Sequence, residues 1–247
     1  MGNPYYRIFF LITLLLSSYS SLSQSGVEST TYLWADQIVG LENSGLIKGT
    51  EYLEQNISIN DNNKYFLSPH LYISGSITVE GEPFYGLHLK YNIFDDLLLL
   101  RVEISGGIRI FQPQRNKIDA FSIADHRFIN IKDEKENQTG LNGFHEVLLE
   151  KENLVLYKKH LLKRKKLLKK KFIYFEFEKN DPDYVIKYKG VYSPATKRRQ
   201  ILQEFPNQRK PIRKFYKEHK KERKENPDHF MVLFTKELSR ILKQDKT

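Results

Sequence analysis

Short stretches in which apolar and polar residues alternate recur along the chain from about Tyr32 to Lys189. Apolar side chains at every second position are typical of β-strands with one buried face. Turn residues separate these stretches: Ser105-Gly106-Gly107 lies between 97–104 and 108–112 and predicts a hairpin. The other stretches predicted to be strands are 76–79, 87–91, 118–123, 127–132, 144–149, 154–159 and 172–178.

Many short strands joined by tight turns predict an antiparallel meander, sandwich or barrel. Sequence patterns typical of helices follow from about residue 191. Ser193-Pro194 predicts the cap and first turn of a short helix, Pro211 opens a second, and Asn226-Pro227 opens a third. We therefore expect a mainly β domain over 24–190 and a basic helical segment over 191–247 that packs on it, α+β overall.

Residues 1–23 have the pattern of a secretory signal peptide. Arg7 provides positive charge, 8–16 are apolar apart from Thr13, and Ser21-Leu22-Ser23 predicts cleavage before Gln24. Nine residues of helix span about 14 Å, too short to cross a hydrocarbon core of about 30 Å. An uncleaved anchor or a buried helix is the alternative interpretation. We expect an exported protein, periplasmic, secreted or at the periphery of the outer envelope, without a transmembrane span in the mature chain.

The chain has 247 residues, no Cys and a formal net charge of +10. Without Cys, a disulfide framework, a thiolate metal site and a Cys nucleophile are excluded. Residues 24–150 carry 10 Lys and Arg against 18 acidic residues, whereas residues 151–247 carry 29 against 12. The positive charge is therefore a property of the C-terminal part alone.

The densest cationic run lies between 158 and 171, with nine cations among fourteen residues and no acid. We expect it to contact an anionic envelope surface such as lipopolysaccharide or lipid phosphates. The alternatives are a solvated hairpin end or short helix, and pairing with the acidic N-terminal half within the chain or in a homo-oligomer. The candidate contact residues are Lys158, Lys159, Lys163, Arg164, Lys165, Lys166, Lys169, Lys170 and Lys171.

The sequence offers little that points to catalysis. Asp95-Asp96 is the one adjacent acid pair in the predicted strands, and it fits a turn better than a glycosidase pair. No two of the seven histidines have HxH or HExxH spacing, and Asp125-His126 and His145-Glu146 are the best acid–His neighbours. Nucleophile motifs of the GxSxG or SxxK type, and RRM or KH signatures, are not found. No catalytic residue, cofactor or metal is predicted, and nucleic acid is disfavoured as a partner.

Three stretches resemble a family of uncharacterised secreted proteins of Bacteroidetes-type gram-negative bacteria. Residues 87–96 are similar to its "LKYDIYxDELVV" segment, and 143–159 resemble its "GFYEVLYEGK…LYKK" hairpin. Residues 191–230 resemble its closing segment, with a "KKxIRKFYKENKK" helix and a "DPxxF" helix start. The chain departs from the family at 194–199, where the family has a KSKKSLL-like run. The resemblance implies an envelope location and a β-rich body, and it carries no established activity.

The sequence thus favours a non-catalytic envelope protein whose basic C-terminal half contacts an anionic surface or an envelope protein complex. An uncharacterised envelope hydrolase or carbohydrate-active protein is the alternative, and it requires a concave pocket with converging polar groups.

Overall fold

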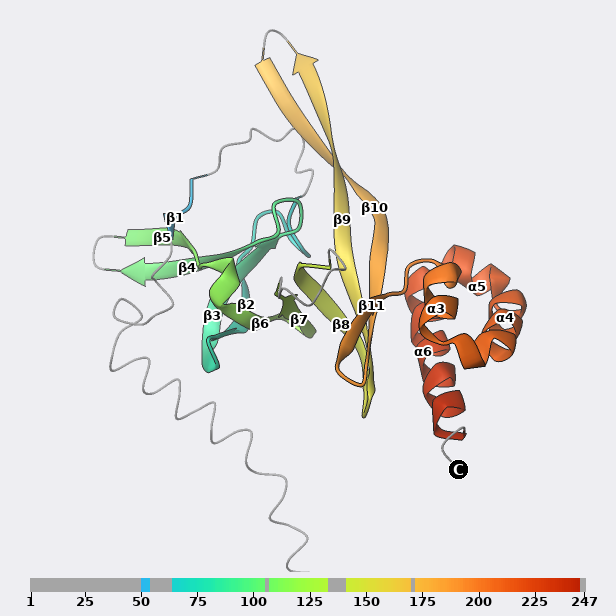
Figure 1. The fold of residues 1–247 in the computed structure, drawn as a ribbon. Coiled ribbons are helices and arrows are strands. Elements are labelled where there is room, and N and C mark those ends of the chain that lie inside the picture. The colour runs from blue at the N-terminus through green and yellow to red at the C-terminus, as the bar shows by residue number, and fades with distance from the viewer. Residues whose placement is uncertain (1–49, 54–63, 105–106, 133–140, 170–171, 245–247) are drawn as a thin grey trace, which may run out of the picture.

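The computed structural model describes residues 50–53, 64–104, 107–132, 141–169 and 172–244. Within them, eleven antiparallel strands form one sheet in the order β1-β5-β4-β3-β2-β6-β7-β8-β9-β10-β11 (Figure 1). The predicted mainly β fold is therefore confirmed. The predicted signal peptide lies outside the described residues. The strands are β1 (Thr50–Glu51), β2 (Ile73–Val79), β3 (Glu82–Asn92), β4 (Leu97–Ile104), β5 (Gly107–Gln112), β6 (Ile118–Ile123), β7 (His126–Ile131), β8 (Gly143–Lys151), β9 (Leu154–Lys169), β10 (Phe172–Tyr188) and β11 (Val191–Pro194), with a 3-10 turn, η4 (Arg115–Lys117), before β6.

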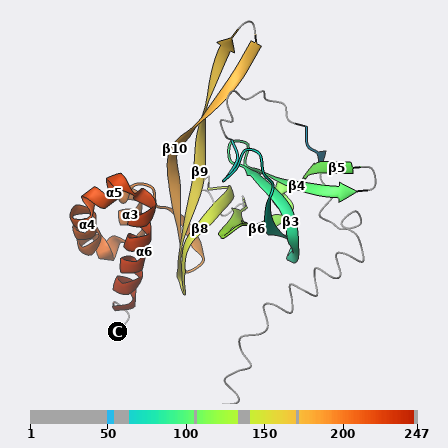
Figure 2. The ribbon, with the colours of Figure 1, turned by 180° about the vertical axis from the view of Figure 1, so that it is seen from behind.

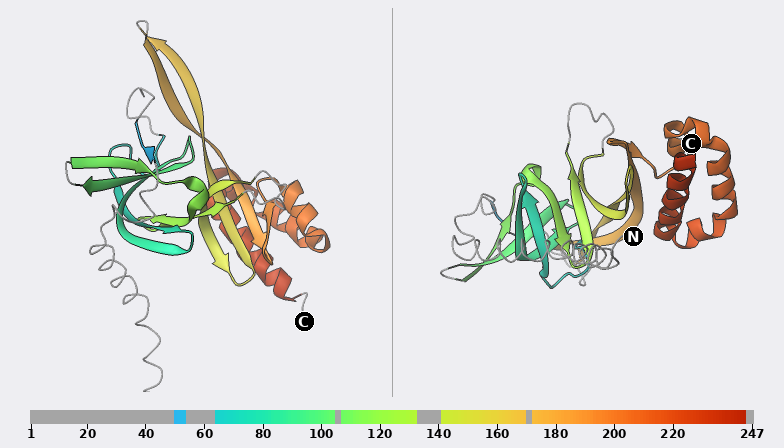
Figure 3. Two further views of the ribbon diagram at one scale, coloured as in Figure 1. Left: turned by 60° about the vertical axis from the view of Figure 1, so that its left-hand side comes forward. Right: turned by 90° about the horizontal axis from the view of Figure 1, so that it is seen from below.

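The sheet consists of two antiparallel meanders that lie side by side. Consecutive strands pair from β2 to β5 and again from β6 to β11, and β2 also pairs with β6, which joins the two runs edge to edge. The part of the sheet from β2 to β8 is strongly curved, as the views in Figure 3 show, and it encloses a core of buried side chains. In this core Tyr91, Phe121, Phe128 and Phe144 contact one another at ring-centroid distances of 4.6–5.8 Å. Burial of these rings holds the curled part together.

A long hairpin, β9–β10, forms the middle of the molecule. Its strands pair from Leu154 and Tyr188 up to Lys169 and Phe172, with a bulge between Asn180 and Asp183. The sequence pattern predicted only the stretches 154–159 and 172–178, so both strands are longer than expected. The far end of the hairpin extends beyond the rest of the sheet in Figure 1.

Helices cover the side of this hairpin that faces away from β1–β7 (Figure 2). A second core joins the two layers: Leu156 and Ile186 of the hairpin pack with Ile201, Phe230 and Phe234 of the helices. Of the helices in the described residues, none has the length and apolar character needed to cross a membrane. The helical elements are α3 (Arg198–Glu204), the 3-10 turn η5 (Pro206–Gln208), α4 (Arg209–Glu218), α5 (Lys220–Glu225) and α6 (Pro227–Gln244).

The start of the helical segment differs from the prediction. Ser193 and Pro194 do not open a helix; they end β11, where they pair with Ile186 and Val185 of β10. The cross-strand pairing outcompetes the capping tendency of Ser-Pro, and α3 begins only at Arg198. The sheet therefore continues beyond the expected boundary at residue 190.

The start of the last helix agrees with the prediction. The Asn226 side chain accepts a hydrogen bond from the His229 backbone N–H at 3.1 Å, and Pro227 is the first residue of α6. This is the arrangement in which Asn caps a helix that opens on proline.

Candidate functional site

The basic run forms a strand over its described residues 158–169, not a helix. Residues 158–169 lie in β9, so successive side chains point to opposite faces. The six cations among the described residues 158–166 are thus divided between two faces and do not form one patch. The side chain of Lys169, and all of Lys170 and Lys171, lie outside the described residues.

Lys158 is directed to the helices rather than to solvent. Its ammonium group donates to the carboxylate of Asp228 at 2.5 Å, and the Tyr184 hydroxyl donates to the other oxygen of Asp228 at 2.5 Å. Burial and this hydrogen bond raise the pKa of Tyr184 well above its ordinary value. Asp228 thereby ties the first turn of α6 to β9 and β10, and Lys158 is not a surface contact.

Lys159 points to the other side and is also used within the protein. Its ammonium nitrogen lies 2.8 Å from Oδ2 of Asp96, and both side chains are about 15% exposed. Asp96 accepts further hydrogen bonds from the Tyr91 hydroxyl at 2.8 Å and from Arg115 at 3.1 Å. Burial lowers the pKa of Lys159 in spite of the attraction of Asp96. The expectation that Lys158 and Lys159 meet an external anion is therefore replaced by two internal ion pairs.

Gly143 makes room for the pair of Lys159 and Asp96. Its φ is +95°, and a Cβ atom there would lie 2.0 Å from Asp96 Oδ2 and 2.7 Å from Lys159 Nζ. Any larger residue at 143 would therefore displace the ion pair, in addition to straining the backbone. Asp95 and Asp96 form the turn between β3 and β4, as expected, with Asp95 hydrogen-bonded to Asn92.

The exposed part of the basic run lies on the outer half of the hairpin. Lys163, Arg164, Lys165 and Lys166 are all exposed there. Lys165 forms an ion pair with Glu178 of β10. The Arg164 guanidinium lies over the rings of Phe94 and Phe175, at 5.2 Å and 4.8 Å from their centroids. Two of the four cations thus already have neighbours that restrain them.

One carboxylate contacts two histidines on the neighbouring strands β7 and β9. Glu146 of β8 is 9% exposed at its side chain and lies 2.5 Å from Nδ1 of His126 and 2.6 Å from Nε2 of His160. Phe66 packs edge-on against both imidazole rings, at centroid distances of 4.9 Å and 5.1 Å. Burial raises the pKa of Glu146, but the hydrogen bonds from His160 and His126 outweigh it, so the net pKa is below its ordinary value.

The sequence did not indicate this cluster. It suggested Asp125 with His126 and His145 with Glu146, whereas the structure places His145 on the opposite face of β8 from Glu146. The His145 ring instead contacts the Gly143 carbonyl at 3.0 Å, and burial lowers its pKa to about 4. Predicting the cluster would have required the strand register, in which Glu146 lies opposite Phe128 of β7 and Lys158 of β9.

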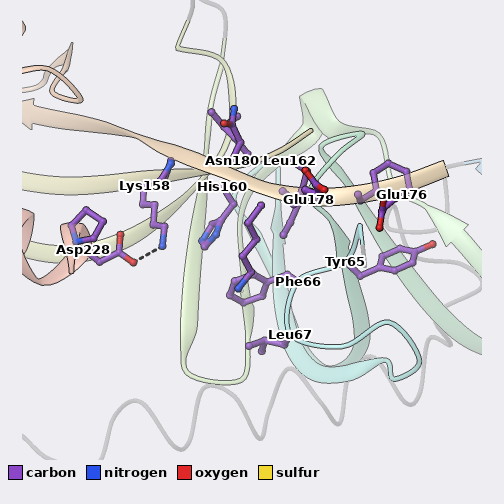
Figure 4. Close-up of a pocket in the computed structure, with 16 residues that line it drawn as sticks. Tyr65, Phe66, Leu67, Lys158, His160, Leu162, Glu176, Glu178, Asn180 and Asp228 are labelled. Atoms are coloured by element: carbon purple, nitrogen blue, oxygen red, sulfur yellow. Dashed lines mark hydrogen bonds and ion pairs between the residues drawn. The ribbon is translucent and has the colours of Figure 1, made fainter. Parts of the chain in front are cut away.

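A cavity of about 780 Å³ lies beside His160, between the segment 65–67, the hairpin and the start of α6. Figure 4 shows His160 and Phe66 close together at its base, with Glu176 and Glu178 above them on β10. Lys158 and Asp228 lie at one end of the cavity, joined by their ion pair. In the described part of the chain, no three His, Asp or Glu side chains are arranged to hold a metal ion.

A second basic region lies on the outer helices. Residues 198–225 carry 11 Lys and Arg against 4 acidic residues, a net charge of +7. Helix α4 buries Ile212 and Tyr216 against Phe230 and Phe234 of α6, so its opposite face meets solvent. The exposed cations of this outer helical face are Arg198, Arg199, Arg209, Lys210, Arg213, Lys214, Lys217, Lys220, Lys221, Arg223 and Lys224.

The outer helical face is only weakly neutralised. Lys214 and Lys221 lie 3.9 Å and 4.0 Å from glutamates one turn later in their own helices, and both pairs are well exposed. Such pairs contribute little and leave the net charge of the face positive. Among the described residues, the outer helical face thus has eleven exposed cations, against four in the described part of the basic run.

Comparisons of this chain with protein-family descriptions, with curated proteins and with solved structures gave no match. The resemblance to secreted Bacteroidetes-type proteins therefore stays a prediction.

Proposed function

We propose that this chain is an exported, non-catalytic protein of the cell envelope that attaches peripherally to an anionic surface through its outer helical face. The observation that carries the proposal is the net charge of +7 on residues 198–225, whose apolar side is buried. A rigid face with many unneutralised cations binds phosphate-rich surfaces, with about 1 kcal/mol contributed per cation close to the surface. The lipid phosphates of an envelope membrane, or lipopolysaccharide, have the required charge.

The architecture favours a peripheral mode of attachment. Helix α6 lies between the sheet and α4, so the cations of α4 and α5 are held on a second layer rather than on flexible chain. The apolar side chains of α4 are used in contacts with Phe230 and Phe234 and are not presented outward. Binding would therefore be electrostatic, without insertion of an apolar helix face into the hydrocarbon.

The proposal is tested in two steps. Fractions of the native cell are first washed with about 1 M salt, which shortens the screening length to about 3 Å. We expect the protein to leave the membrane fraction and its N-terminus, by mass spectrometry, to be Gln24. An intact Met1 in the cytosol, or retention on membranes at high salt, would contradict the proposal. Purified protein is then sedimented with phosphatidylcholine vesicles that contain or lack phosphatidylglycerol, and only the anionic vesicles should carry it down.

The cavity beside His160 favours a second candidate, an envelope hydrolase. A neutral His160 that donates Nε2–H to Glu146 has its lone pair on Nδ1, as a general base requires. The carboxylates of Glu176 and Glu178 line the same cavity. The test is hydrolysis of a panel of envelope polysaccharides and esters by the wild type, H160Q and E178Q. Turnover that H160Q abolishes without loss of folding would replace the first proposal with this one.

A further inference from the structure

Four arginines of the outer helical face surround one hollow. The hollow has a volume of about 420 Å³ and lies between α3 and α4, which the turn η5 joins. Arg198 and Arg199 border it from the first turn of α3, and Arg209 and Arg213 border it from α4. Leu202 and Gln203 complete its lining. The hollow is an open depression of the surface rather than an enclosed pocket.

The arginines at this hollow have no carboxylate partner in the part of the chain that the structure describes. Within the described residues, none of them forms a hydrogen bond or ion pair with a carboxylate, whereas Arg109 and Arg127 of the sheet and Arg115 of η4 each have one. The lining of the hollow includes no acidic residue. Like charges that face one small space repel one another, and an anion placed among them removes this repulsion.

The type of cation matters as well as its number. A guanidinium is planar and donates two parallel hydrogen bonds to a phosphate, which an ammonium cannot do. Elsewhere on the outer helical face the exposed cations are mostly lysines, but all four cations at this hollow are arginines. The arrangement suits a group with several anionic oxygens and a charge of about −2, because it offers two or more bidentate contacts.

We propose that this hollow is a specific site for a phosphomonoester or pyrophosphate group. The inference rests on the proposed function and names its ligand chemistry: the outer helical face binds such a group in preference to a phosphodiester of equal total charge. The group belongs either to a phosphorylated lipid headgroup or to a free phosphorylated molecule. Both sources present the same terminal phosphate oxygens to the four arginines.

The experiment compares two variants with equal loss of charge. One carries Arg198→Gln, Arg199→Gln, Arg209→Gln and Arg213→Gln. The matched control carries Lys210→Gln, Lys217→Gln, Lys220→Gln and Lys224→Gln, all exposed and on α4 and α5 of the same outer helical face. A third variant replaces the four arginines by lysine, which keeps the charge and removes the bidentate geometry. All eight positions are exposed, so far-UV circular dichroism and thermal unfolding should match the wild type for every variant.

Vesicles test the lipid source. Phosphatidylcholine vesicles contain phosphatidic acid, a phosphomonoester, or enough phosphatidylglycerol, a phosphodiester, to give the same surface charge. We expect the wild type and the Lys→Gln control to bind phosphatidic acid about tenfold more tightly than phosphatidylglycerol. The Arg→Gln and Arg→Lys variants should both lose this preference. An equal preference in all four proteins, or none in the wild type, would overturn the site in lipid and leave charge alone as the basis of binding.

Inorganic pyrophosphate tests the free ligand. Thermal unfolding is followed with pyrophosphate and with sodium chloride at the same ionic strength. A rise in Tm in the wild type and the Lys→Gln control, but not in the Arg→Gln and Arg→Lys variants, supports the site even if the protein binds no vesicles. In that case the surface proposal fails and the site stands. The inference is overturned if pyrophosphate raises the Tm of no protein and the wild type does not prefer phosphatidic acid to phosphatidylglycerol. If the wild type still binds anionic vesicles in that case, the proposed function stands.

Discussion

In the sheet, the carboxylates of Asp96 and Glu146 are surrounded by cationic or hydrogen-bonding groups from neighbouring elements. On the outer helices, Arg199 and Arg213 have no carboxylate partner among the described residues and face the solvent. The difference follows from the cost of burial, because a charge inside the protein is stable only when it is paired. Exposed charges have no such requirement. The buried charges of this protein therefore contribute to its stability, and the exposed unpaired charges are the better candidates for binding a ligand.

The largest effect is expected at Asp96. Asp96→Asn removes the charge that compensates Lys159, while Asn tolerates the left-handed φ of 54° at this position. An unpaired buried ammonium should lower the free energy of unfolding by about 3–5 kcal/mol, measured by urea denaturation. Asp125→Asn, at an exposed position in the turn between β6 and β7, is the control and should change it by less than about 0.5 kcal/mol. Equal effects of the two variants would show that the buried pair is not structural.

His145 tests burial of a titratable group without a charged partner. Its pKa in the folded protein is about 4, against 6.5 ordinarily, chiefly because of burial. The unfolded chain binds the proton more readily, so stability is lost as pH falls from about 6.5 to about 4. The expected loss from this residue is about 3 kcal/mol between pH 7 and pH 4.

His145→Gln should reduce that pH dependence by the same amount, and His88→Gln, at an exposed position, should leave it unchanged. The measurement is urea denaturation at a series of pH values. A His145→Gln protein with the acid sensitivity of the wild type would assign the sensitivity to other groups.

Glu146 is expected to have a smaller effect than Asp96. Glu146→Gln keeps the size of the side chain and removes the charge that His126 and His160 share, at an expected cost of about 2 kcal/mol at pH 7. The pKa of Glu146 is lowered in the folded protein, so its contribution is present above its ordinary pKa of 4.5 and is lost as the carboxylate protonates at lower pH.

The difference between Glu146→Gln and the wild type should therefore shrink below about pH 4, as urea denaturation across pH would measure. A difference that stays constant down to pH 3 would mean that packing of Phe66 and the two imidazole rings, not charge, is what the substitution disturbs.

The sequence predicted the hairpins well and the clusters poorly, for one physical reason. The pairing of β4 with β5 and the cap at Asn226 each involve residues that are close together in the sequence, so both could be predicted directly. Glu146 meets His126 and His160 only through the registers of three strands, which alternation does not fix. For the same reason, the basic run at 158–171 was recognised but not the division of its cations between two faces.

The hairpin and the outer helical face give the finest comparison, because neutralising either removes only exposed charge. The hairpin variant carries Lys163→Gln, Arg164→Gln, Lys165→Gln and Lys166→Gln. The helical variant is the Lys→Gln control on α4 and α5 described above. Neither should shift the urea midpoint. On phosphatidylglycerol vesicles the helical variant should bind at least about a hundredfold more weakly than wild type. The hairpin variant should lose less than about tenfold, because Glu178 already offsets Lys165 and the Arg164 guanidinium is held over two rings. The reverse order would place the membrane contact on the hairpin.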